Sequence, residues 1–246
     1  MIVLRPIELM NIIQTVIGTE VTARNTSGPL PLQLIEILGE GAKVIEEISE
    51  SLELPVTGAT ARNMLGRADT SEKLRTAMLQ IGNTLFMELD KRKFYGPLER
   101  YTKYFEPEQL FGAEVFNNFA SANDDIYEAG TCLALERATA CVMHLMRVLE
   151  AGLAALAKAV GISKQNDWAA YLRKIGAELD ARAKASGART ADEQFYAEAA
   201  ANFDRLRRAF RNPTMHPEKT YSQERAEEIL IATKSFMAHL ATQLSE

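Results

Sequence analysis

The chain has 246 residues, of which 47% are apolar, 25% charged and 7% aromatic, and its formal net charge is −5. This composition is that of a globular protein with one large domain or two modest ones, and its 14 Gly and 8 Pro exclude a fibrous or disordered chain. The negative net charge excludes a surface that attracts nucleic acid or anionic lipid over its whole area, so any polyanion site must be a local patch.

The first half of the chain is expected to be helical, because Gly and Pro are too sparse for a strand-and-turn protein. Apolar residues recur at helical spacing in four segments, residues 5–24, 32–54, 57–66 and 70–92. Residues 94–121 hold much of the aromatic content, and we interpret them as short irregular helices that pack the two halves together. We assign residues 1–105 to a helical N-terminal region without an identifiable role.

The second half shows longer helical patterns. Residues 122–160 predict one long helix, with Asn123 or Asp124 as its N-cap and Gly161 as its stop. Further helices are expected over residues 166–186 and 190–212 and from Thr220 or Ser222 onward. We therefore predict an all-α protein in which residues 106–246 form a four-helix bundle.

The sequence also predicts a cytoplasmic location. No signal peptide is visible, and the most apolar stretch, residues 138–160, is interpreted as a core helix because it contains His144, Arg147, Glu150 and Lys158. On one helix, Cys132 and Cys141 would lie on opposite faces about 13 Å apart along the axis and could not form a disulfide. Two buried thiols suit a reducing compartment.

Several common motifs of enzymes are missing. The sequence contains no phosphate loop, no GxGxxG, no HExxH, no CxxC and no GxSxG. With 3 His and 2 Cys in the chain we expect no metal site and no cofactor. We interpret His239 as a surface residue, and His144 as a core histidine bonded to a neighbour or as part of a polar face near a cleft.

His216 lies between two prolines, where one predicted helix has ended and the next has not begun. Arg211 is placed on the last turn of the preceding helix, and Asn212 is expected to leave the helical region because Pro213 follows it. A guanidinium offers planar donors to phosphate oxygens, and an imidazole titrates near neutral pH. Together these groups suffice for metal-free cleavage of a phosphodiester. The alternative is structural, with Arg211 at a helix C-terminus and His216 capping carbonyls.

A basic run surrounds this corner. Residues 200–219 carry five cations against Asp204 and Glu218, a local excess of three positive charges. Apart from Arg211, the cations are Arg205, Arg207, Arg208 and Lys219. We interpret them as candidates for binding RNA phosphates, the alternative being a solvated helix face.

The motif Arg-Asn-x-x-x-His at a helix-end corner resembles the HEPN (higher eukaryotes and prokaryotes nucleotide-binding) superfamily. The resemblance covers about residues 110–246, and within the superfamily this region is similar to bacterial HEPN-like proteins of unassigned function. It is carried by the segments Glu128-Ala129-Gly130, Leu133-Ala134-Leu135, residues 144–150 and residues 210–217. The superfamily allows four to six residues between the Arg and the His, and Arg211 and His216 have four between them. A second pair, Arg137 and His144, has six between them and also fits, but both fall inside the expected long helix and are interpreted as structural.

The resemblance implies a metal-independent endoribonuclease that acts as a homodimer on RNA, such as a toxin or phage-defence effector with an antitoxin or nucleotidyltransferase partner. It implies His216 as acid and base, Arg211 as the clamp on the transition state, and Asn212 as an orienting residue. The alternative is a non-catalytic helical interaction or regulatory module.

Three polar residues recur along the predicted long helix, His144, Arg147 and Glu150. Arg147 and Glu150 are three residues apart and are expected to form an ion pair on the helix surface. The family likeness offers the alternative that these residues line a cleft.

Overall fold

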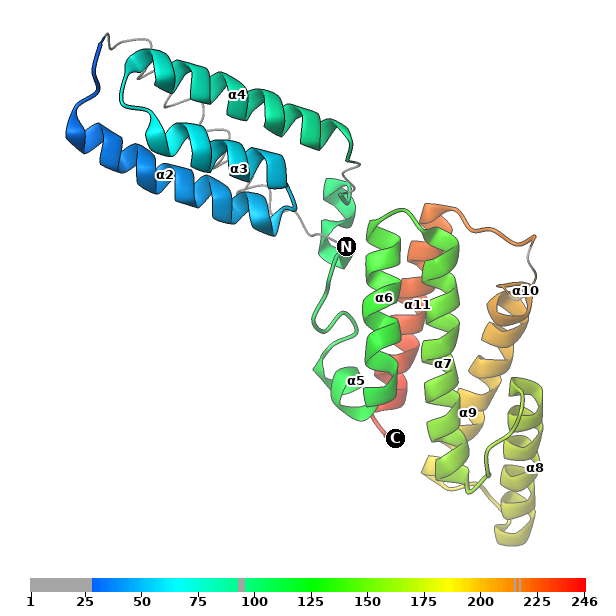
Figure 1. Cartoon of the computed structure of the whole chain (residues 1–246). Coiled ribbons are helices and arrows are strands. Elements are labelled where there is room, and N and C mark those ends of the chain that lie inside the picture. The colour runs from blue at the N-terminus through cyan, green and yellow to red at the C-terminus, as the bar shows by residue number, and fades with distance from the viewer. Residues whose placement is uncertain (1–27, 93–95, 215, 217) are drawn as a thin grey trace. The chain divides into compact units, whose positions relative to one another are not determined.

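The computed structural model describes residues 28–92, 96–214, 216 and 218–246; the helix expected over residues 5–24 lies outside them. Within these residues the protein is all-α, as predicted: they contain no β-strand, and a single isolated bridge joins Pro29 to Thr70. The chain divides into two compact units, Met1–Phe94 and Tyr95–Glu246 (Figure 1). The sequence placed this division at residues 105 and 106.

The described part of the N-terminal unit contains three helices, α2 (Leu32–Ser51), α3 (Pro55–Met64) and α4 (Ser71–Asp90), with the short helix η1 (Leu65–Arg67) after α3. The first helix was expected to continue to Leu54 and stop at Pro55, but it ends at Ser51, and Glu53 after it is left-handed with a φ of 52°. Pro55 instead opens the second helix, because the first turn of a helix needs no backbone N–H. The core contains residues from all of these helices, including Ile45, Ala61, Leu65, Leu74 and Ile81.

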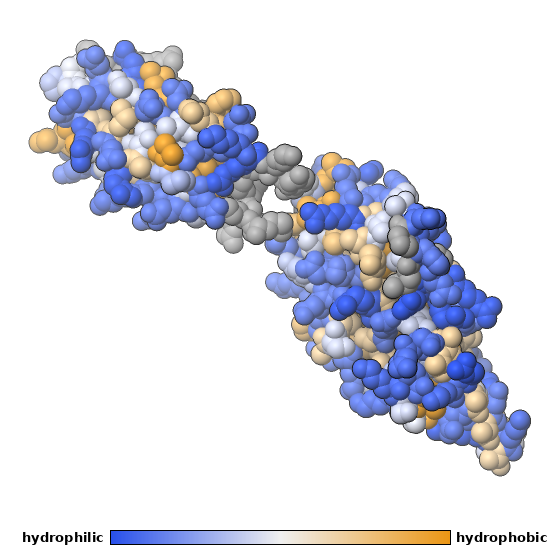
Figure 2. Space-filling view, turned by 45° about the vertical axis from the view of Figure 1, so that its right-hand side comes forward, coloured by the Kyte–Doolittle hydropathy of each residue, from blue (hydrophilic) through white to orange (hydrophobic). Residues whose placement is uncertain are grey.

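This unit also exposes apolar side chains, which appear as orange patches in Figure 2. They lie on α2, α3 and α4, and the large ones are Leu32, Ile37, Val44, Val56, Leu79, Phe86 and Met87.

The aromatic segment belongs to the C-terminal unit. It forms short elements, as predicted, and these are η2 (Glu99–Tyr104), α5 (Ala113–Asn118) and η3 (Ala120–Ala122). Tyr101, Tyr104, Phe111 and Phe119 are all buried in the same core as the long helices of this unit.

The expected long helix over residues 122–160 is two helices, α6 (Asn123–Ala134) and α7 (Ala138–Val160), and this prediction was wrong. Glu136 adopts a left-handed conformation with a φ of 59°. The Arg137 N–H donates to the Cys132 carbonyl and the Glu136 N–H to the Leu133 carbonyl, the bond pattern that ends many helices. Arg137 is therefore at the start of α7 and not inside a helix.

The predicted N-cap, Asn123 or Asp124, was also wrong, because Ala122 occupies that position without a side-chain cap. The predicted stop at Gly161 is confirmed, with a φ of 83°.

Helix α7 lies at the centre of the C-terminal unit. It packs against α6 and against the later helices α8 (Trp168–Ser186), α9 (Ala191–Leu206) and α11 (Gln223–Ala241). Within the described chain α7 alone is long and apolar enough to cross a membrane, but 61% of its most apolar stretch is buried inside this unit. It is the core helix that the sequence predicted.

The later helices begin and end at residues that satisfy their free backbone groups. Ser222 caps α11, and Gly187 ends α8 in a left-handed conformation, both as predicted. Thr190 and Glu193 form a reciprocal capping box at the start of α9.

Gly130 of α6 allows the chain between η2 and α5 to approach this helix closely. A Cβ at Gly130 would lie 2.8 Å from the Tyr104 carbonyl oxygen and 3.0 Å from the Pro107 ring. A Cβ added at Gly176 of α8 would have nothing within 4 Å of it.

We expect Gly130→Ala to lower the free energy of unfolding by about 1–3 kcal/mol, because backbone cannot yield as a flexible side chain does. Gly176→Ala should raise the free energy of unfolding by about 0.5–1 kcal/mol, since alanine favours helix. Urea titrations followed by the fluorescence of Trp168, the sole tryptophan, measure both changes. Equal effects of the two substitutions would contradict the close approach at Gly130.

Candidate functional site at the end of α9

The chain stays helical after the last α-helical residue of α9, Leu206. A π-helical turn, η4 (Arg207–Arg211), follows it, and a short helical turn, α10 (Asn212–Thr214), follows η4. Asn212 has helical backbone angles, φ −63° and ψ −51°, so the prediction that it leaves the helical region before Pro213 was wrong. Pro213 has no backbone N–H to donate to a carbonyl in the preceding turn. The π-helical turn η4, which is wider than an α-helical turn, lies directly before α10, where the hydrogen-bond pattern changes. Such π-helical turns often occur at functional sites.

Side chains pin the corner to the rest of the unit. The Thr214 hydroxyl donates to the Phe210 carbonyl oxygen at 2.7 Å, so the Tyr221 hydroxyl, also 2.7 Å away, donates to Thr214. The backbone N–H of Tyr221 donates to the Thr139 hydroxyl on α7. The turn after η4 is therefore held against the central helix.

Arg211 is the last residue of η4, and its guanidinium contacts Glu150 of α7. The distance between the Arg211 NH2 nitrogen and Glu150 Oε1 is 3.4 Å, longer than the roughly 2.7–2.9 Å of a tight charge-assisted bond. The same Glu150 oxygen accepts a hydrogen bond from the indole of Trp168 at 2.9 Å. The Arg211 side chain is 29% exposed, and its contact with Glu150 is loose.

The other two residues of the predicted catalytic group are exposed. Asn212 lies directly after Arg211 on α10, and His216 lies in the turn that follows. The carbonyl of His216 accepts a hydrogen bond from the Lys219 N–H at 3.0 Å.

The basic run is partly neutralised. Arg207 and Arg208 both pair with Asp204, at 2.9 and 2.7 Å, and the bond from Arg207 holds the pKa of this carboxyl below its ordinary value. Lys219 lies over the Tyr221 ring, and Arg205 is exposed. Two of the four predicted phosphate-binding residues, Arg207 and Arg208, are thus engaged by a carboxylate.

The expected pair between Arg147 and Glu150 was wrong: Arg147 bonds to Asp125 of α6. Its Nε lies 2.7 and 2.9 Å from the two oxygens of that carboxylate, and this bond raises the pKa of Arg147. His144 Nδ1 lies 2.8 Å from the same Asp125. His144 is bonded to a neighbour, as predicted. His144 and Arg147 thus both contact Asp125, whereas Glu150 contacts Arg211 and Trp168.

Sequence reasoning did not include Asp125 or Trp168 in the site. Asp125 lies in the first turn of α6, where an acidic residue is ordinary, and carries no signal of its partners on α7. Trp168 is buried, and its indole N–H needs an acceptor, which Glu150 supplies. The sole tryptophan of the chain was the available signal.

Fold and site together define an all-α protein whose C-terminal unit carries an arginine at the end of a π-helical turn and an exposed histidine after it. The chain matches no protein-family model, and comparisons with curated proteins and with solved structures also find no match.

Proposed function

We propose that the protein is a metal-independent endoribonuclease of the HEPN type, with Arg211 and His216 as its catalytic pair. The observation that carries the proposal is the placement of Arg211. Arg211 is the last residue of the π-helical turn η4, and its side chain is 29% exposed. Among the described residues its guanidinium has one ion-pair contact, the 3.4 Å contact to Glu150. A phosphate can compete for such a guanidinium, whereas a tightly bound structural arginine would not exchange partners.

The proposed roles follow from the chemistry of the side chains. His216 would take the proton from the ribose 2′-hydroxyl and protonate the leaving 5′-oxygen, because an imidazole nitrogen can accept a proton and then donate it. Arg211 would stabilise the extra negative charge on the phosphate oxygens in the transition state. Asn212, exposed between them, would orient the phosphate or the imidazole.

We also propose that RNA binding involves the basic run and a homodimer. The patch of Arg205, Arg207, Arg208 and Lys219 offers few free cations, because two of them pair with Asp204. Affinity for RNA grows with the number of phosphates neutralised, so two copies across a two-fold axis would bind better than one.

A four-helix bundle of the HEPN type, a cytoplasmic location, and a role as a toxin or defence effector with an antitoxin or nucleotidyltransferase partner belong to the same proposal. The two buried free cysteines suit that compartment.

A non-catalytic helical interaction module is the second candidate. The ion pairs of Asp204 with Arg207 and Arg208 favour it, because they stabilise the end of α9 without any ligand.

The two candidates differ in an assay of RNA cleavage. We expect the purified full chain to cleave single-stranded RNA in EDTA at the same rate as in magnesium. His239→Ala serves as a control for the loss of an imidazole outside the corner. Cleavage that vanishes in EDTA and returns with magnesium would contradict the mechanism, and no cleavage under any condition would favour the interaction module.

A further inference from the structure

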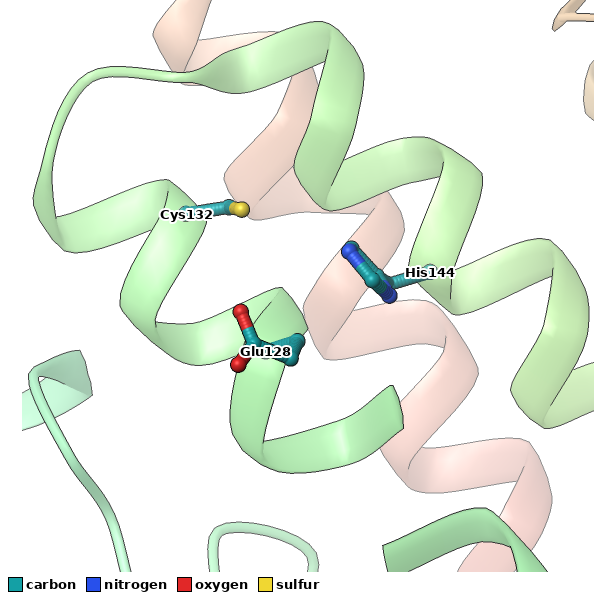
Figure 3. A group of neighbouring side chains, drawn as sticks. All are labelled: Glu128, Cys132 and His144. Atoms are coloured by element: carbon teal, nitrogen blue, oxygen red, sulfur yellow. The ribbon is translucent and has the colours of Figure 1, made fainter. Parts of the chain in front are cut away.

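Three side chains of metal-binding type meet between α6 and α7. Glu128 and Cys132 are four residues apart on α6 and share one face of it, and His144 faces them from α7 (Figure 3). One ligand atom from each residue lies within 4.8 Å of the other two. A tetrahedral zinc ion holds such atoms about 3.5 Å apart, so small side-chain rotations bring them into range. In the described residues no other group of His, Cys, Asp and Glu meets this criterion.

Asp125 supplies what a metal-binding histidine needs on its far side. Its carboxylate lies 2.8 Å from His144 Nδ1, which fixes the proton on that nitrogen and leaves the Nε2 lone pair as the ligand. Asp125 is itself held by Arg147 at 2.7 and 2.9 Å, and its side chain is 14% exposed. The imidazole is therefore oriented before any ion arrives.

The charges and donor types also fit one ion. Zinc binds cysteine sulfur, histidine nitrogen and glutamate oxygen, and the two anionic ligands balance its charge. That balance matters because Cys132 is buried, where an uncompensated charge is costly. Glu128 is exposed, which gives the ion a path from solvent.

We propose that Glu128, Cys132 and His144 bind a zinc ion that joins α6 to α7, with a water molecule as its fourth ligand. The zinc site is separate from the proposed ribonuclease site, because His144 and Glu150 are six residues, or about 9 Å, apart along α7. Counting histidines and cysteines did not predict it, since two of its ligands lie on one helix and the third on another.

The test uses the full chain, first treated with chelator and then titrated with zinc chloride or cobalt chloride. We expect one ion per chain and, with cobalt, the near-ultraviolet charge-transfer band of a thiolate bound to the metal. At a zinc concentration of 100 times Kd, the Tm of the protein should rise by roughly 5–10 °C.

Variants identify the ligands. Cys132→Ala should remove the cobalt–thiolate band, and His144→Gln or Glu128→Gln should each weaken zinc binding at least tenfold. Cys141→Ala is the matched control, because Cys141 is the other buried free cysteine and lies on α7 outside the group. It should bind zinc as the wild type does.

Absence of the thiolate band in the folded wild-type protein would overturn the proposal, as would zinc binding that survives in the Cys132 and His144 variants. Circular dichroism of the same samples checks that each variant is folded, and Glu128→Gln changes only an exposed side chain. Ribonuclease activity does not enter the test, so failure of either proposal leaves the other to be judged alone.

Discussion

Replacing His216 by alanine is expected to lower the rate of RNA cleavage by about 10²–10⁴-fold, the usual contribution of a general acid or base. The imidazole is exposed and lies outside the core, so the fold should not need it. We expect the free energy of unfolding to change by no more than about 0.5 kcal/mol. A large loss of activity with an unchanged Tm would separate a catalytic role from a structural one.

The control for His216 is His239→Ala. His239 lies on α11, with its ring 4.9 Å from that of Phe195, so its loss removes an imidazole that packs against the core. This variant should keep its cleavage rate at a temperature where it is folded. Equal cleavage by the wild type and His216→Ala would show that this histidine performs no proton transfer.

Replacing Arg211 by alanine is expected to lower kcat by about 10²–10³-fold, as the loss of one donor to a developing negative charge does. Arg211→Lys should recover part of this loss, because lysine keeps the charge but lacks the planar pair of donors. In the folded protein the alanine variant loses the 3.4 Å contact to Glu150, a weak ion pair, so we expect its stability to change little.

Arg205→Ala is the matched control for Arg211, since it removes the same charge from an exposed position on α9. We expect it to raise KM and to reduce the salt dependence of RNA binding while kcat stays unchanged. If both arginine variants change only KM, Arg211 binds RNA without stabilising the transition state.

The helices were predictable to the extent that capping and stop residues were recognisable. The start of α11 is marked by Ser222, whose side chain caps it, and the ends of α7 and α8 are marked by left-handed Gly161 and Gly187. Each of these three boundaries lies where the sequence predicted one. The break at Glu136 was not predictable in this way. A left-handed glutamate ends α6, and no Gly or Pro is present to indicate it.

The candidate site was predictable in its order along the chain but not in its partners. Pro213 was expected to end the helix at Arg211, but Asn212 and Pro213 continue the helical run as α10. The π-helical turn that contains Arg211 leaves no mark in the hydrophobic pattern. The pairing of Arg147 with Asp125 required knowledge of how α6 lies against α7. The group of Glu128, Cys132 and His144 depends on the same packing, so local spacing could not indicate it.

The most direct measurement of the central claim is the chemistry of the RNA ends that the wild-type protein leaves in EDTA. Attack by the ribose 2′-hydroxyl, which the proposed roles of His216 and Arg211 require, leaves a 2′,3′-cyclic phosphate on one product and a 5′-hydroxyl on the other. We expect these ends, and we expect no cleavage of an oligonucleotide that carries 2′-deoxyribose at the cleaved position. Products with a 3′-hydroxyl and a 5′-phosphate would contradict the account, because they require attack by water.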